Sequence, residues 1–236
     1  SLVIGYGLTR DTFSAAERAK VDDFLRRVVD EEKAWVRSSE VDPKRRHRLE
    51  TNWNAHRLKL VGLIGYAIGG EELVASVLAD YRRHLEGNIN ADGSTYDFHQ
   101  RDALTYHVYD LAPLLTLAAY AAAHGTDLFD LRGTANQSLA EGIAFIVPFC
   151  SGEREHLEFV HTTSPNDIAR SKSGVLPFGK PWNCAESGRR ILPLATAFDP
   201  RYKELMQCLG SAGSWNGHGA RAAIASLPEG ARTSSA

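Results

Sequence analysis

The chain has 236 residues, of which 43% are hydrophobic and 24% are charged, so it is long enough to bury one substantial core and we expect a single domain. A formal net charge of -2 excludes the broad basic surface of nucleic-acid-binding proteins. No run of about 18 apolar residues and no charged leader are present, so we predict neither a membrane span nor an intact signal peptide. The three cysteines are widely spaced without a CxxC pair, which argues against a zinc module and a dense disulfide framework.

The predicted elements are helices joined by short turns. Residues 1–10 are read as a glycine-punctuated lead-in, and Thr12 or Ser14 can cap a helix that runs to Val36. Residues 38–50 are polar and basic, and we predict a solvated connector there.

The next two elements form a predicted helical hairpin. Residues 52–68 and 71–85 both show helical spacing of apolar side chains, and only Gly69 and Gly70 separate them. Short glycine links between helices indicate antiparallel neighbours.

Residues 102–123 are predicted to form the central helix, preceded by the turn formers of residues 92–94. One face of this helix is apolar (Leu104, Val108, Leu111, Leu115, Ala118 and Ala122). Pro113 cannot donate to the carbonyl of Tyr109 four residues earlier, so a kink is expected beside Tyr109. We expect this helix to pair with another over residues 133–149.

The pattern loosens beyond Cys150. Residues 158–162 are read as a short extended piece and residues 163–182 as a long surface loop. Helical spacing returns over residues 183–197 and 200–209, and residues 210–236 are read as a loose tail rich in Gly, Ser and Ala. The expected fold class is therefore all-α.

Two polar clusters carry the candidate chemistry. The first, residues 52–57 (Asn-Trp-Asn-Ala-His-Arg), begins a helix, where the helix dipole is expected to depress the pKa of His56. The second contains Arg101, Tyr106, His107 and Tyr109. Taken singly, His56 is more often a capping or packing residue, and each aromatic residue is more often at the edge of a core.

Together, Asn, His, Arg and Tyr are the set that β-elimination on a uronic acid requires. The C5 proton of a uronate becomes removable when donors such as Asn, His or Arg neutralise the carboxylate. A base then removes this proton while an acid protonates the departing O4, and a tyrosine can serve either step.

Residues 54–64, 92–94 and 103–109 (Ala-Leu-Thr-Tyr-His-Val-Tyr), with Leu111, Pro113 and Leu114, resemble the helical alginate lyases that cleave polymannuronate. The resemblance covers residues 49–149 well and residues 177–202 more loosely. It implies an (α/α) toroid, here an incomplete barrel of antiparallel helical hairpins without the first helices of the family. It also implies a metal-free mechanism with no cofactor, and secretion or a periplasmic location.

The resemblance also assigns residues. His56 matches the active-site histidine of the family, Tyr109 its catalytic tyrosine, and Arg101 its carboxylate-neutralising arginine, although Arg101 stands one residue further from the tyrosine than in the family pattern. Ala55 precedes the histidine where the family has asparagine, so Asn54 or Asn52 is expected to fill that role. The remaining cleft-wall candidates are Trp53, Tyr106, His107 and Arg190.

The predicted function is therefore a polysaccharide lyase that cleaves a β-linked polyuronate, with alginate, glucuronan and mixed uronates all open as substrates. A glycoside hydrolase on a helical toroid is the alternative, because Asp97, Asp102 and Asp110 offer carboxyl groups. A polyuronate-binding protein without turnover is a further alternative. We expect an acidic polysaccharide as partner, with no nucleic acid and no membrane.

Overall fold

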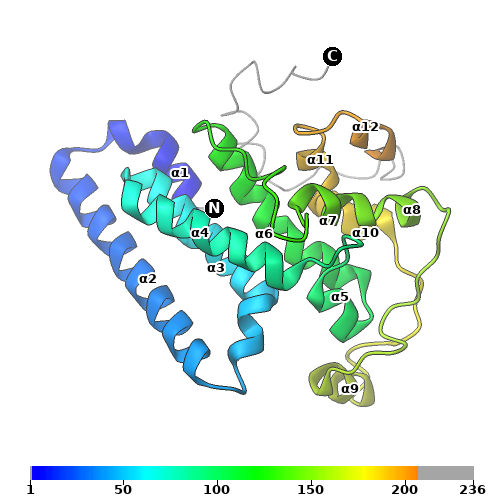
Figure 1. Ribbon diagram of the computed structural model, residues 1–236. Helices are drawn as coiled ribbons and strands as arrows, with labels where there is room; N and C mark the ends of the chain where they lie inside the picture. The colour runs from blue at the N-terminus through cyan, green and yellow to red at the C-terminus, as the bar shows by residue number, and fades with distance from the viewer. Residues whose placement is uncertain (1, 207–236) are drawn as a thin grey trace.

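The computed structural model describes residues 2–206, and the elements in that range are helices (Figure 1). Within it, only the isolated bridges Ile89–Thr95 and Leu157–Pro181 have β character, so the predicted all-α class is confirmed. The α-helices are α1 Leu2–Thr9, α2 Ala15–Val41, α3 Asn52–Ile68, α4 Glu71–Asn88, α5 Tyr96–Arg101, α6 Leu104–Ala122, α7 Leu139–Phe145, α8 Val147–Cys150, α9 Pro165–Lys172, α10 Cys184–Ser187, α11 Leu192–Ala195 and α12 Tyr202–Leu205. The 3-10 helices are η1 Arg10–Thr12, η2 Arg46–Glu50 and η3 Gly188–Arg190.

The centre of the molecule is the packing of α3 against α4 and α6, which lie beside one another in Figure 1. A Cβ atom at Gly62 would lie 2.5 Å from Leu117 Cδ1, so glycine allows α3 to approach α6 closely. Gly69 ends α3 in a left-handed conformation at φ 68° and turns the chain into α4. The predicted hairpin of residues 52–85 is therefore present, with α4 three residues longer than expected.

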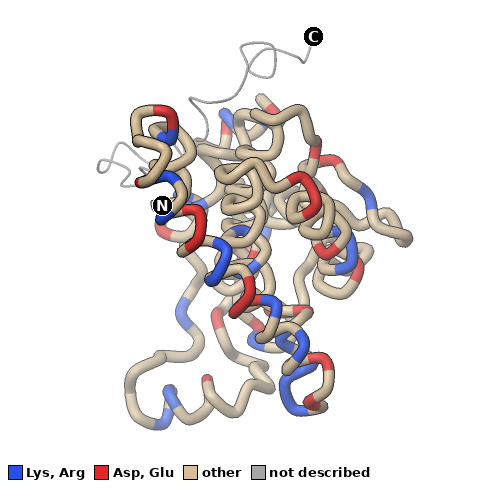
Figure 2. Tube along the Cα trace, turned by 90° about the vertical axis from the view of Figure 1, so that its left-hand side faces the viewer, with Lys and Arg blue, Asp and Glu red and all other residues tan. Residues whose placement is uncertain are grey.

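Helix α2 runs along the outside of this centre. Of the two predicted caps, Ser14 is the one used, in a capping box with Glu17. Leu25 and Val29 face the core, whereas Lys, Arg, Asp and Glu alternate along the exposed length of the helix (Figure 2). The helix ends at Val41, so the predicted end at Val36 was too early.

The lead-in predicted for residues 1–10 was wrong, because residues 2–9 form helix α1. Val3, Ile4 and Tyr6 of this helix are buried against the core, and the Tyr6 hydroxyl donates to Asp22 Oδ1 at 2.6 Å. Packing and a buried hydrogen bond thus override the low helix propensity of the glycines here.

A short helix that the sequence did not predict, α5, precedes the central helix. Thr95 caps α5, and Asp102 ends it in a left-handed conformation at φ 49°. Helix α6 therefore begins at Leu104, two residues later than predicted, and Pro113 lies inside it as expected.

The second half of the chain is more broken than predicted. Its partner for α6, helix α7, begins only at Leu139, and residues 183–197 divide into α10, η3 and α11. Residues 158–162 form turns rather than an extended piece, and the predicted loop of residues 163–182 contains α9. A disulfide joins Cys150 to Cys184. The predicted helix over residues 200–209 appears as α12, while Cys208 and the predicted tail lie outside the described residues.

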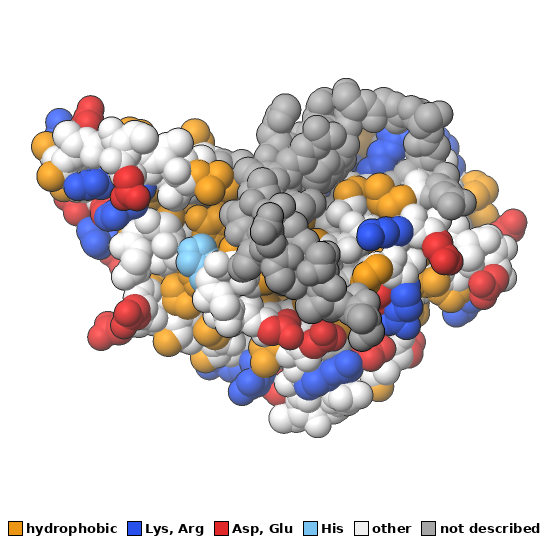
Figure 3. All heavy atoms as spheres, turned by 90° about the horizontal axis from the view of Figure 1, so that it is seen from above, with side chains coloured by type: hydrophobic (Ala, Val, Ile, Leu, Met, Phe, Trp, Pro, Cys, Tyr) orange, Lys and Arg blue, Asp and Glu red, His pale blue; other side chains and the backbone are white. Residues whose placement is uncertain are grey.

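Seen from above, hydrophobic side chains reach the surface in separate groups between charged ones (Figure 3). Among residues 2–206, no helix has the length and apolar character needed to cross a membrane.

Candidate active site

A cavity of about 470 Å³ opens between the first turns of α6 and the segment that runs from residue 157 to residue 190. Tyr106 and Tyr109 line it from α6, and Arg190 lines it from η3. The other lining residues are Thr105, Glu158, Phe159, Arg170, Leu176, Pro177, Lys180, Pro181, Trp182, Asn183, Glu186 and Ser187. A concave site with both aromatic and charged walls is typical of carbohydrate-sized ligands.

His56 and Tyr109 meet at the edge of this cavity. Their ring centroids are 4.7 Å apart, because α3 packs against α6. Tyr109 is 37% exposed, whereas the Nε2 atom of His56 is buried without a hydrogen-bond partner among the described residues. Unpartnered buried nitrogens are rare in folded proteins, and this one lies beside a cavity-lining tyrosine, as a proton-transfer group would.

The imidazole of His56 is held in its neutral form. Its pKa is lowered to about 4, first by burial and then by the positive charges of Lys59 and Arg190. The direction agrees with the expectation from the sequence, but the largest cause is burial rather than the helix dipole.

Arg190 brings positive charge to the same place. Its guanidinium carbon lies 5.7 Å from the centroid of the Tyr109 ring. Within residues 2–206, no ion pair involves Arg190, Arg170 or Lys180, and all three line the cavity. They therefore present guanidinium and ammonium groups that are free to bind an acidic ligand.

Glu158 is the buried acid of the cavity. Both of its carboxylate oxygens accept from the backbone N–H of Thr105, at 3.3 and 3.4 Å. Glu158 thus provides a hydrogen-bond acceptor for an N–H in the first turn of α6, which has no partner within the helix. Burial raises the pKa of this carboxyl group, and the hydrogen bonds from Thr105 oppose that change.

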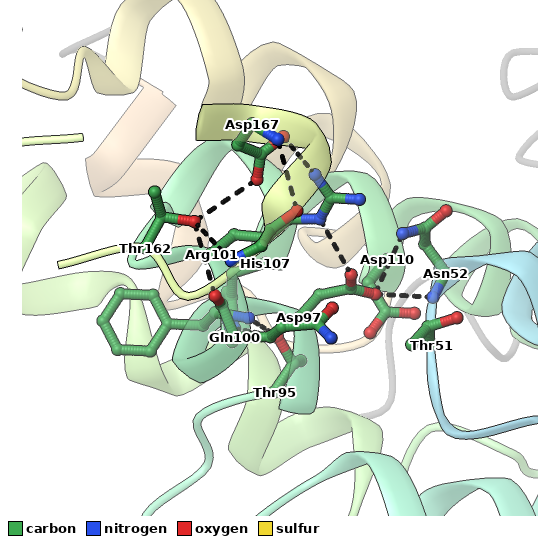
Figure 4. A network of polar contacts seen from close by, with 12 residues as sticks. Thr51, Asn52, Thr95, Asp97, Gln100, Arg101, His107, Asp110, Thr162 and Asp167 are labelled. Carbon is green, nitrogen blue, oxygen red and sulfur yellow. Dashed lines mark hydrogen bonds and ion pairs between the residues drawn. The ribbon is translucent and has the colours of Figure 1, made fainter. Parts of the chain in front are cut away.

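Arg101 occupies a different position from the one predicted. Its Nη1 atom donates to the buried Asp167 of α9 at 2.6 Å, and its Nε atom lies 3.4 Å from Asp97 Oδ1 (Figure 4). Its guanidinium also lies over the Tyr106 ring, 3.8 Å from the centroid. Two buried carboxylates already neutralise this arginine, so in this arrangement it joins α5 to α9 rather than facing the cavity.

The two asparagine candidates are also engaged inside the protein. Asn52 donates from its backbone and its side chain to Asp97 Oδ2, at 2.6 and 3.0 Å (Figure 4). Asn54 accepts from Arg57 Nε at 2.7 Å and donates to the Leu49 carbonyl at 2.9 Å. Neither lines the cavity, and the Asp97 carboxylate takes the place of a side-chain cap at the start of α3.

Only two of the four predicted cleft-wall residues line the cavity. Tyr106 and Arg190 line the cavity, but His107 is completely buried, and its Nδ1 and Nε2 atoms contact Thr95 Oγ1 and the Gly142 carbonyl. Its assignment to the cleft wall was therefore wrong. Trp53 is exposed on the first turn of α3 and does not line the cavity.

Sequence reasoning missed the contribution of residues 157–183. Glu158, Arg170, Lys180 and Trp182 come from a stretch without helical periodicity, which was read as a short extended piece followed by a surface loop. The Leu157–Pro181 bridge joins the two ends of this stretch to each other, and the Cys150–Cys184 disulfide joins α8, which precedes it, to α10, which follows it. Cysteine spacing was the one available signal, and the sequence did not show which cysteines pair.

Comparisons with known proteins identify the family of the chain and a structure of similar fold. The alginate lyase family matches residues 6–156, which is more than half of the chain. A crystal structure of an alginate lyase from Bacteroides ovatus is similar in fold, with a TM-score of 0.60 and 15% sequence identity. The similarity covers 91% of this chain and 50% of that chain, so this chain spans about half its length. No curated protein matches this sequence. On the strength of the family match, the chain belongs to the alginate lyase family.

Proposed function

We propose that this protein is a polysaccharide lyase that cleaves a β-linked polyuronate by β-elimination. The observation that carries the proposal is the pair of His56, neutral and with an unpartnered Nε2 atom, and Tyr109, at the edge of a cavity lined by cations. In the proposed step, His56 removes the C5 proton. The electrons form the C4–C5 double bond, the C4–O4 bond breaks, and Tyr109 protonates the departing O4.

The carboxylate of the substrate is assigned to Arg190. A uronate loses its C5 proton readily only when a cation or hydrogen-bond donors stabilise the developing negative charge. Arg190 lies beside Tyr109 without an ion-pair partner in the described part of the chain, whereas Arg101 is held between two buried carboxylates. We therefore move the neutralising role from Arg101 to Arg190, and treat Arg101, Asn52 and Asn54 as residues that position α3, α5 and α9.

A glycoside hydrolase is the second candidate, favoured by one observation. Glu158 and Glu186 both line the cavity, and burial raises the pKa of Glu158 as a general acid would need. The carboxyl groups first considered for this role do not line the cavity: Asp97 and Asp110 are buried, and Asp102 binds His161. Because both oxygens of Glu158 bind the start of α6, we favour the lyase.

The discriminating experiment mixes the protein with polymannuronate and, separately, with glucuronan. β-Elimination creates an unsaturated uronate that absorbs near the ultraviolet edge, and hydrolysis creates new reducing ends without that absorbance. Growth of the absorbance in proportion to the reducing ends supports the lyase. Reducing ends alone support the hydrolase, and binding without either product supports a polyuronate-binding protein.

The same proposal covers partner and location. An acidic polysaccharide is the expected partner, and the choice between alginate, glucuronan and mixed uronates is left to the assay above. Secretion or a periplasmic location is proposed on family grounds, since such polymers lie outside the cytoplasm.

A further inference from the structure

The first turn of α3 exposes a tryptophan outside the cavity. Trp53 is 58% exposed, which is unusual for the largest apolar side chain. The guanidinium carbon of Arg48, from η2, lies 5.7 Å from the centroid of its ring. Packing does not explain Trp53, because it is absent from the buried core and from the residues packed against that core.

A run of basic residues precedes this tryptophan in the chain. The basic tip, residues 44–48, joins α2 to α3, and its first four residues are exposed. Lys and Arg gather at this lower end of α2 in Figure 2. Arg45 pairs with Asp42 at 3.2 Å, and Arg46 shares a hollow with Glu40 and Glu50. Lys44 and Arg48 have no ion-pair partner among residues 2–206, and Arg48 lies beside Trp53, so the positive charge next to the ring is not neutralised by an ion pair.

This surface continues the candidate active site. Trp53 and His56 are three residues apart on α3, so their side chains are neighbours on one side of the helix. His56 in turn contacts Tyr109 at the edge of the cavity. A sugar chain that leaves the cavity past Tyr109 and His56 therefore meets Trp53 and Arg48 next.

We propose that Trp53 and Arg48 form an outer platform that binds one uronate residue of the polymer beyond the cavity. The apolar C–H face of the pyranose stacks on the indole ring, and its carboxylate pairs with Arg48, assisted by Lys44. This inference rests on the proposed function and adds to it: with sugar bound on both sides of His56 and Tyr109, the enzyme attacks within long chains rather than at their ends.

The test compares Trp53→Ala with Phe24→Ala, and Arg48→Gln with Arg27→Gln. Phe24 is a matched control because it is 56% exposed on α2, and Arg27 is an exposed arginine of the same helix. Affinity for polymannuronate and glucuronan is measured by titration calorimetry, with polyglutamate as an anionic polymer without sugar rings. Initial rates are then measured on polymer and on the shortest oligomer that is cleaved, and melting temperatures are recorded for each variant.

Trp53→Ala is expected to weaken polymer binding roughly three- to tenfold, the loss of one stacked ring, while Phe24→Ala leaves it unchanged. The rate on the shortest oligomer and the binding of polyglutamate are expected to stay at the wild-type level. Equal affinities for the Trp53 and Phe24 variants, or an equal loss for polyglutamate, would overturn the platform. If no substrate gives unsaturated product but Trp53→Ala still weakens binding to polyuronate, the platform stands and the proposed function falls.

Discussion

Substitution of Arg101 distinguishes most clearly between a role in binding substrate and a role in stabilising the fold. Its side chain is 13% exposed, and it contacts Asp167 and Asp97, whose side chains are 0% and 1% exposed. Arg101→Gln removes the cation and leaves both carboxyl groups buried. Breaking a buried ion pair from one side typically costs about 3–5 kcal/mol, because the remaining charge is left buried without its partner. We therefore expect Arg101→Gln to lower the free energy of unfolding by about 3–5 kcal/mol.

The assay is urea unfolding followed by circular dichroism, with the product rate measured on the same preparation. Arg101→Lys keeps the charge but not the fork that reaches two carboxylates, so its loss of stability should be smaller. Arg190→Gln is the matched control: Arg190 is exposed, so stability should hardly change, while the rate should fall roughly a hundredfold or more. An Arg101→Gln variant with wild-type stability and no turnover, beside an active Arg190→Gln variant, would refute the reasoning and return the neutralising role to Arg101.

Further predictions concern proton transfer, the disulfide and metals. Tyr109→Phe should lower the rate roughly a hundred- to ten-thousandfold with little change in melting temperature, and a variant that cleaves within a few-fold of wild type would contradict the assignment. Because the pKa of His56 is lowered to about 4, its neutral form persists as the pH falls from 6.5 toward 4, and the acid limb of kcat/KM should lie near pH 4. Lys59→Met removes a positive neighbour and should move that limb to higher pH; an unmoved limb would show that another group titrates. The same lowered pKa makes stability depend on pH. Because the unfolded state binds a proton at His56 more readily than the folded state, the free energy of unfolding should fall as the pH falls from 6.5 toward 4. Replacing Cys150 and Cys184 with serine should lower the free energy of unfolding by about 4 kcal/mol, measured by urea unfolding, because 34 positions separate them in sequence. Dialysis against EDTA should leave the product rate unchanged, and a loss that one added metal restores would contradict a metal-free elimination.

Local patterns predicted the helices that carry the core. The spacing of apolar side chains and the glycines at positions 69 and 70 are sufficient to place α3 and the start of α4, because both signals act within one or two helical turns. The apolar spacing of residues 104–122 likewise predicted that Pro113 lies inside a helix, α6. Tyr109 and His56 were identified from their residue types and from family resemblance, and the structure brings their rings to 4.7 Å.

The sequence could not predict which groups the charged side chains contact. Arg101 meets Asp167 across 66 positions of the chain, and Glu158 meets Thr105 across 53. Such pairs depend on where a turn redirects the chain, as Asp102 does with its left-handed conformation, and no local pattern encodes that direction. For this reason the sequence placed both Arg101 and Arg190 in the cleft, whereas in the structure only Arg190 of these two lines the cavity.

What the sequence by itself determined was the all-α class and the central hairpin, which follow from periodicity, a local property. It also singled out His56 and Tyr109 as candidates, from their residue chemistry and from the resemblance to the family. Only the tertiary structure decided that Arg101 is held in ion pairs, that His107 is buried, and that side chains from residues 157–190 line the cavity. Those outcomes depend on burial and on charges brought together from distant segments, because the free energy of a charged group is set by its surroundings rather than by its neighbours in the chain.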